Sequence, residues 1–176
     1  MPCSQTLSGL ARECGVNLGG IKEVYLANFD DVASVTITSN LITAITMNGT
    51  PAKKFYAYVF NPNTSNFTTT IQANRENGSL YFETVLSLVF AKQDATKRVE
   101  VNALAQAGMM AIVRDANDVC YLLGYNEPLL MTSGTAETGT AKADRNGYAL
   151  EFTDAQMQMP YMLDPSDADT IISGLL

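Results

Sequence analysis

Residues 66–90 read NFTTTIQANRENGSLYFETVLSLVF and decide the fold, because apolar and polar residues alternate on both sides of a turn signal. The pair Asn77 and Gly78 favours a tight turn between two antiparallel strands. Alternation with a period of two is typical of a strand that buries one face. The stretch therefore predicts one long β-hairpin.

The second arm of this hairpin, residues 79–91, is unusually long. At about 3.3 Å per residue it would span roughly 43 Å, about twice the length of a typical strand. We expect the face that carries Leu80, Phe82 and Leu86 to lie in the core. A helix over residues 83–91 is an alternative, because several apolar residues there also fit helical spacing.

The opposite face of the hairpin mixes apolar and polar residues, so we expect part of it to contact something outside the subunit. The expected interface residues on the two arms are Thr68, Thr70, Tyr81, Glu83, Val85 and Val89.

Short segments rich in β-branched and aromatic residues surround the hairpin and predict further strands. They are residues 21–29, 32–38, 41–47, 53–60, 109–115, 119–125, 128–134 and 147–153. Residues 94–107 predict the single helix, with Asp94 as N-cap and Gly108 as the left-handed residue after its end. Its expected buried stripe is Val101, Leu104 and Ala105.

This order of elements predicts a mainly β (α+β) fold in one domain: an antiparallel β-sandwich or barrel with one α-helix. The expected parts are an N-terminal arm over residues 1–20, the β domain over residues 21–154 and a C-terminal tail over residues 155–176. The tail carries Met157, Met159, Tyr161 and Met162, and methionine-rich segments adapt readily to a partner surface. We include these four residues in the expected oligomer interface.

The composition indicates assembly and argues against several other roles. Charged residues make up 16% of the chain, against roughly 25% in an average soluble domain, and interface cores are depleted of charge. The net charge is −7, and the last third of the chain holds eight acidic and two basic residues. Tight nucleic-acid binding needs a basic surface, so we expect DNA contact only in passing. No apolar run predicts a membrane span or a signal peptide.

The sequence offers no recognisable catalytic equipment. It contains no histidine, no phosphate-binding loop and no dinucleotide fingerprint, so the usual general base and the commonest metal ligand are missing. Asp164, Asp167 and Asp169 lack the pattern of a calcium loop, and a helix cap with a solvated turn is the preferred interpretation. We predict no enzyme activity, no cofactor and no metal. The three cysteines are expected to be reduced, with a Cys3–Cys14 bridge as the alternative.

Five segments in order carry a resemblance to a known group of proteins: GGIKEVYLANFDDV, NGSLYFETVLSLVF, KRVEVNALAQA, AIVRDANDVCYLLGYNEPLL and ADRNGYALEF. Together they resemble tail-tube-like and ring structural proteins of tailed bacteriophages, closest to crAss-like and related phages of Bacteroides-type hosts. The resemblance spans roughly residues 19–153. Asp118 stands where glycine would be expected in the turn after Asn117.

This resemblance implies a virion protein of the tail or neck, made in the host bacterial cytoplasm. It implies a fold of tail-tube type and homo-oligomeric rings that contact adjacent virion proteins and form a conduit for DNA and protein ejection. Acidic residues of the last third are then candidates for the lumen wall, or they only keep the subunit soluble. These candidate lumen acids are Glu137, Asp144, Asp164, Asp167 and Asp169. A β-sandwich glycan-binding module or adhesin is the alternative function, although the chain has no tryptophan for sugar stacking.

Overall fold

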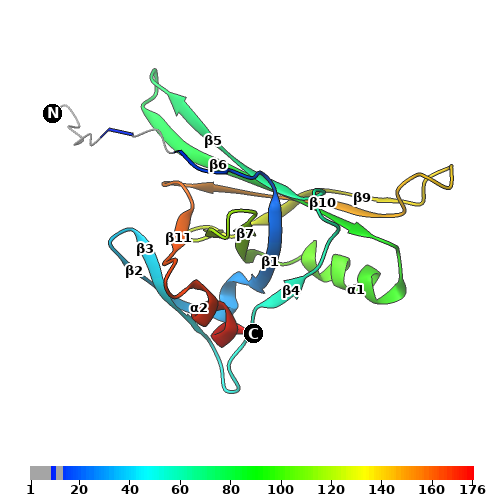
Figure 1. Ribbon diagram of the computed structural model, residues 1–176, viewed down its shortest axis with the longest axis horizontal. Helices are drawn as coiled ribbons and strands as arrows, with labels where there is room; N and C mark the ends of the chain where they lie inside the picture. The colour runs from blue at the N-terminus through cyan, green and yellow to red at the C-terminus, as the bar shows by residue number, and fades with distance from the viewer. Residues whose placement is uncertain (1–8, 11–13) are drawn as a thin grey trace.

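The computed structural model describes residues 9–10 and 14–176 and shows a mainly β fold built from two sheets (Figure 1). The larger sheet has the strand order β2-β3-β11-β8-β7-β1-β4, and the smaller one has the order β5-β6-β10-β9. The sheets pack as an open sandwich and do not close into a barrel, which confirms the predicted fold class. Within the described residues the β11–β3 pair is parallel, and the other strand pairs are antiparallel.

The strands of the larger sheet are β1 (Ile21–Asn28), β2 (Val32–Thr38), β3 (Leu41–Met47), β4 (Tyr56–Tyr58), β7 (Met109–Asp115), β8 (Cys120–Leu123) and β11 (Tyr161–Leu163). Those of the smaller sheet are β5 (Asn66–Asn74), β6 (Ser79–Ala91), β9 (Leu130–Glu137) and β10 (Gly147–Gln156). The helices are η1 (Phe29–Asp31), a short 3₁₀ turn, α1 (Ala95–Leu104) and α2 (Ala168–Leu175).

The predicted hairpin is β5 and β6, joined by the four residues 75–78, which include Asn77 and Gly78, and it is paired from Asn66↔Ser87 to Asn74↔Ser79. Gly78 has a φ of 72°, the left-handed conformation that glycine adopts without strain. The helical alternative for residues 83–91 is wrong, because this segment is continuous strand. Strand β6 pairs with β5 on one side and with β10 on the other, so its backbone groups are hydrogen-bonded along most of the strand.

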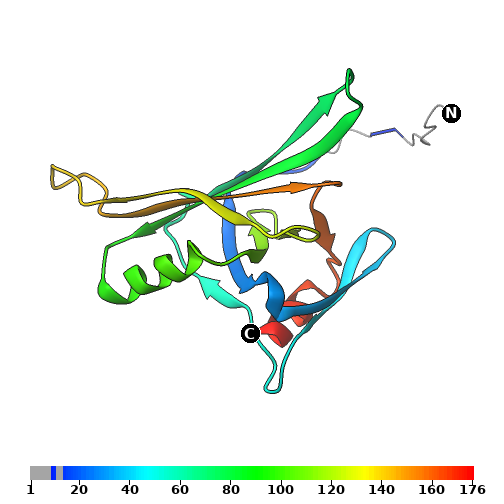
Figure 2. The same ribbon diagram turned by 180° about the vertical axis from the view of Figure 1, so that it is seen from behind.

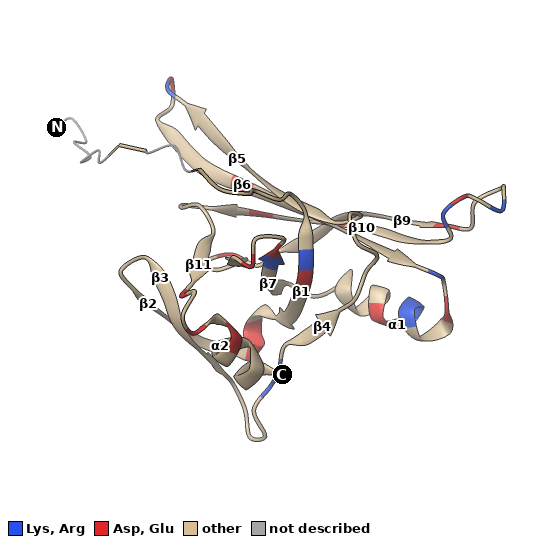
Figure 3. Ribbon diagram, viewed as in Figure 1, with Lys and Arg blue, Asp and Glu red and all other residues tan. Residues whose placement is uncertain are grey.

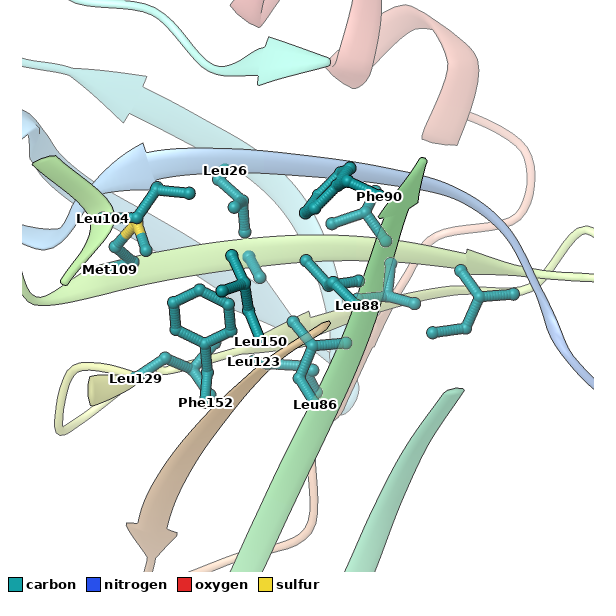
Figure 4. Close-up of a cluster of buried hydrophobic side chains, with 14 of the residues drawn as sticks. Leu26, Leu86, Leu88, Phe90, Leu104, Met109, Leu123, Leu129, Leu150 and Phe152 are labelled. Carbon is teal, nitrogen blue, oxygen red and sulfur yellow. The ribbon is translucent and has the colours of Figure 1, made fainter. Parts of the chain in front are cut away.

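The main core lies between the two sheets and is drawn in Figure 4. On β6 the buried residues alternate, because Thr84, Leu86, Leu88 and Phe90 are buried while the residues between them are half-buried. Residues of β1, β7 and β10 meet them from the other strands. A second core on the far side of the larger sheet holds α2 through Ile172 and Leu175.

The expectation of one helix and of a tail over residues 155–176 is wrong. β10 continues to Gln156, β11 joins the larger sheet, and α2 follows with Ala168, Ile172 and Leu175 buried. The backbone N–H of Phe55 donates to the carbonyl of Leu175. Packing against β3 and β11 therefore makes this segment part of the domain.

Helix α1 confirms most of the local prediction and corrects its end. The Asp94 side chain accepts a hydrogen bond from the backbone N–H of Lys97, as an N-cap does. The helix ends near Ala105, which is exposed, so only Leu104 of the predicted stripe is fully buried. Gly108 is not left-handed; a Cβ there would lie 2.8 Å from the Pro128 ring, so close packing excludes a larger side chain.

The expected N-terminal arm is described at residues 9–10 and 14–20, and these residues form neither helix nor strand. Asn117, in the turn between β7 and β8, holds the arm by accepting from the Leu18 N–H and donating to the Leu18 carbonyl. Cys14 is exposed and forms no disulfide with a described residue. Cys3 lies outside the described residues, so their expected alternative pairing stays a prediction.

Candidate assembly surfaces

In the described part of the chain the smaller sheet ends in two strands, β5 and β9, that each pair on one side only. β5 contains no charged residue, and β9 contains one, Glu137 at its end. Free edges usually carry charge, proline or bulges that prevent pairing with another chain. β9 has one such bulge against β10, beside Met131, and is regular from Ser133 to Glu137. Both edges therefore retain stretches that can accept another strand.

One face of the smaller sheet packs on the core, and no described element covers the other face (Figures 1 and 2). The expected interface residues of the hairpin all lie on this uncovered face, as strand alternation predicts. Thr68 and Thr70 are exposed, Tyr81 is 43% exposed, and Glu83, Val85 and Val89 are half-buried. The Gln72 amide donates to the Glu83 carboxylate across the hairpin at 3.1 Å.

The uncovered face carries little charge, as Figure 3 shows for the strands of this sheet. The only charged residues on these four strands are Glu83, Glu137, Glu151 and Asp154, and Asp154 is buried. Threonine and serine fill much of the rest, and some of them bond to each other, as Thr132 and Thr153 do at 2.8 Å. A neutral polar surface of this kind costs little to desolvate in a contact between subunits.

The four expected interface residues near the C-terminus lie between β10 and α2. Met157 and Met159 are exposed in the β10–β11 connection. Met162 is 42% exposed on β11, while Tyr161 packs edge-on against Tyr125. Because Gln156 pairs with Phe82 on β6, this connection starts near the hairpin end of the smaller sheet. The structure thus brings the methionines toward that end, although Tyr161 is held within its own subunit.

The candidate lumen acids do not form one surface (Figure 3). Glu137 and Asp144 belong to the β9–β10 hairpin. Glu137 pairs with Arg145 at 2.9 Å. Asp144 accepts hydrogen bonds from the backbone of Thr140 and Ala141 in the loop, and these bonds lower the pKa of its carboxyl. Both acids therefore have a local role in shaping this loop.

The other three candidate acids lie at the start of α2. Asp164 accepts from the Ser166 side chain and backbone, which lowers the pKa of Asp164. Asp167 is the N-cap of α2 without a side-chain capping bond. Asp169 pairs with Arg114 of β7. Asp164 thus forms the expected turn before α2, Asp167 occupies the expected cap position without a capping bond, and Asp169 serves to dock the helix.

Arg114 is the centre of a small charged network between β7, β1 and α2. Its side chain is 15% exposed, and its guanidinium faces both Asp169 and Glu23, with the latter at 3.3 Å. Burial alone would lower the pKa of Arg114, but the hydrogen bond to Asp169 and nearby negative groups raise it. The network therefore stabilises the docked position of α2.

Asp154 is the one buried carboxylate that the sequence did not single out. Its Oδ2 accepts from the Gly124 N–H at 2.8 Å and from the Gln156 amide at 3.0 Å. Gln156 also accepts from the Asn126 N–H and donates to the Glu127 carbonyl. Burial raises the pKa of Asp154, and these bonds offset part of that effect. The pair ties the loop after β8 to β10.

No group of three or more potential metal-ligating side chains comes together in the described part of the chain. None of the helices described by the structure is both long and apolar enough to cross a membrane.

The core-facing side of the hairpin is exposed at its tip, although the sequence pattern placed Leu80 in the core. Ile71 and Leu80 lie on the core-facing side and are 58% and 59% exposed. The hairpin reaches beyond the larger sheet at this end (Figure 1), so no described part of the subunit covers them. Alternation gives the side of a strand that faces the core, but not the point at which the core stops.

Comparison with known proteins gives no match to a family model, to a curated protein or to a solved structure.

Proposed function

We propose that this protein is a structural virion subunit that joins copies of itself into rings in a bacteriophage tail or neck. The observation that carries the ring is the smaller sheet, whose two edges β5 and β9 pair with no further strand of the described residues and are nearly uncharged. The assignment to a phage rests on the sequence resemblance alone. Adjacent tail or neck proteins would be its other partners.

The strand order makes side-by-side joining regular. Four strands in β5-β6-β10-β9 order with antiparallel pairing leave the two edge strands running in opposite directions. When one copy is placed beside the next, β9 and β5 of the neighbour are therefore antiparallel, and the sheet continues across the boundary. A contact between two different surfaces of the same chain generates a closed ring when the rotation closes.

The charge of the chain suits a conduit that DNA passes through. The net charge is −7, so the subunit as a whole does not favour phosphate binding. Glu137, Asp144 and Glu151 lie on the β9–β10 side of the smaller sheet, where Lys142 and Arg145 offset part of their negative charge. In the proposed ring, DNA touches the wall without being held by it.

Proline substitution in β5 tests the edge pairing. Backbone N–H groups along an edge strand point alternately to the neighbouring strand and to the free side, and proline has none. One of the variants Thr69→Pro and Thr70→Pro therefore loses a backbone hydrogen bond to β6. The other loses only an N–H group that points to the free side of the sheet. We expect the variant that keeps the wild-type melting temperature to lose its rings in sedimentation and electron microscopy. Normal rings from that variant would reject β5 as the joining edge.

The second candidate function is glycan binding, and one feature favours it. A polar hollow of about 680 Å³ at the hairpin tip is lined by side chains that include Gln72, Arg75, Glu76 and Tyr81. Tyrosine rings stack on sugars, and amide and charged groups bind hydroxyls. Binding of the isolated monomer to a glycan array, lost in Tyr81→Ala, would support this function over the ring.

A further inference from the structure

The tip of the β5–β6 hairpin carries apolar side chains that no described part of its own subunit buries. Ile71 lies opposite Phe82, and Ala73 lies opposite Leu80, all on the side that further along the strand is core. Phe82 is half-buried, but Ile71 and Leu80 are more than half exposed. Their exposure is unfavourable in an isolated subunit, because apolar surface is stabilised by leaving water.

A groove of matching character lies between β4 and α1. It encloses about 170 Å³ and is lined mainly by apolar side chains, among them Tyr58, Phe90, Val101, Leu104 and Tyr148. A cavity on the order of 150 Å³ with apolar walls can bind a molecule as large as benzene. The groove therefore has room for one branched aliphatic side chain. An adjoining hollow of about 180 Å³ shares Tyr58 and Leu104.

The tip and the groove lie at opposite ends of the same strand. Leu80 is near the start of β6 and Phe90 is near its end, which places them about 33 Å apart at about 3.3 Å per residue. Figures 1 and 2 show the hairpin tip and α1 at opposite ends of the smaller sheet. A subunit cannot insert its own tip into its own groove, so the contact requires a second copy.

The charges beside the two surfaces are complementary. The turn of the hairpin carries Arg75 and Glu76, and the groove is bordered by Lys97 and Glu100. Each side thus carries one cation and one anion. Lys97 donates to the carbonyls of Ala91 and Lys92, and Glu100 accepts from the Tyr58 hydroxyl, so these two groups would be shared when Glu76 meets Lys97 and Arg75 meets Glu100. Complementary charges of this kind fix orientation and register more than they add affinity.

We propose that the hairpin tip of one subunit inserts Leu80 into the β4–α1 groove of a second copy of this chain and places Ile71 in the adjoining hollow. The contact runs along the strands, whereas the edge pairing of the ring runs across them. It therefore joins one ring to the next, and in this sense it rests on the proposed function. Because tip and groove are different surfaces, repetition of the contact produces an open stack.

Mixed cysteine variants test the contact directly. Two proteins are prepared with Cys3 and Cys14 replaced by Ser; one carries Leu80→Cys and the other Val101→Cys. After mixing and mild oxidation, we expect a covalent heterodimer at least tenfold above the yield with Val99→Cys in place of Val101→Cys. Val99 is a matched control, because it is 61% exposed on α1 and does not line the groove. Equal yields from the two mixtures would overturn the proposal.

A charged substitution at the tip distinguishes this contact from the contacts that form the ring. We expect Leu80→Asp to leave single rings intact and to shorten stacks at least tenfold in electron micrographs. Ser79→Asp adds the same charge at the neighbouring position on the other face of β6 and should leave stacks unchanged. Rings that stack normally in Leu80→Asp would refute the tip contact and leave the ring proposal standing. Both proposals fail if the wild-type protein forms no ring and if the Leu80→Cys and Val101→Cys variants also form no disulfide with each other.

Discussion

Thr69 and Thr84 face each other across the β5–β6 hairpin with their hydroxyl oxygens 3.1 Å apart, and they mark the point where the hairpin leaves the core. Thr84 is fully buried. On one side of this pair, Leu86 and Leu88 are completely buried; on the other side, Ile71 and Leu80 are exposed. The hairpin is therefore one continuous structure with two roles, a core strand pair at its base and a projecting surface at its tip.

The uncovered face of the smaller sheet gives the first prediction. Val85 and Val89 are half-buried on this face, whereas Leu86 between them points into the core. We expect Val85→Asp or Val89→Asp to reduce ring formation at least tenfold while the monomer still folds. Leu86→Asp, the matched control, should prevent folding, because it buries an unpaired charge. Sedimentation measures assembly, and circular dichroism measures folding. Unchanged rings in both valine variants would remove this face from the interface.

The Arg114 network predicts that losing Asp169 and losing Arg114 lower the free energy of unfolding by different amounts. Arg114 is 15% exposed and faces two carboxylates, whereas the Asp169 side chain is 87% exposed. Asp169→Asn should lower the free energy of unfolding by less than about 1 kcal/mol, the usual value for an exposed ion pair. Arg114→Ala should cost about 2–4 kcal/mol, because it also removes packing and leaves Glu23 without its cation. Urea unfolding measures both values, and equal costs would contradict this account.

Asp154 predicts a pH dependence with a definite sign. Burial raises the pKa of its carboxyl in the folded state, so the ionised form destabilises the fold at pH values above the raised pKa. As the pH falls from there toward the ordinary carboxyl pKa, protonation relieves this cost. The stability of the wild type relative to Asp154→Asn should therefore increase over this window and stay constant below it. A difference that is constant or decreases on acidification would show that the buried carboxyl is not strained.

Gly147 predicts a strong effect of one methyl group. A Cβ at this position would lie 2.0 Å from the carbonyl oxygen of Phe90 on the adjacent strand. This contact is with backbone, which cannot move away without a large energetic cost. Gly147→Ala should lower the free energy of unfolding by at least about 2 kcal/mol. Gly15→Ala is the control, because a Cβ there would meet nothing within 4 Å, and it should change stability by about 0.5 kcal/mol or less. Denaturant unfolding compares the two variants, and similar stabilities would refute the predicted clash.

Local patterns were sufficient to predict the hairpin and α1. The period-two alternation and the turn at Asn77 and Gly78 act between neighbours in the sequence, and so does the cap of α1 by Asp94. Helix α2 could not be found in this way. It has eight residues, too few for local propensity to stabilise a helix in water, and its stability comes from packing against β3 and β11.

The surfaces proposed for assembly depend on information that lies far apart in the chain. Whether β5 and β9 are edges is decided by the order of strands in the sheet, which one strand's sequence does not specify. Arg114 and Asp169 are 55 residues apart, and no spacing rule connects them. The predicted interface residues of the hairpin fell on one uncovered face because alternation is local, while Leu80 was misassigned because the limit of the core is set by the other sheet.

The central claim is that this chain assembles into closed rings, and imaging of the purified full-length protein at high concentration tests it most directly. Electron microscopy combined with mass measurement of the particles should show rings of one size, with a mass that is a fixed multiple of the 19.0 kDa subunit. A protein that remains monomeric at high concentration, together with virions that contain no ring of this chain, would contradict the account.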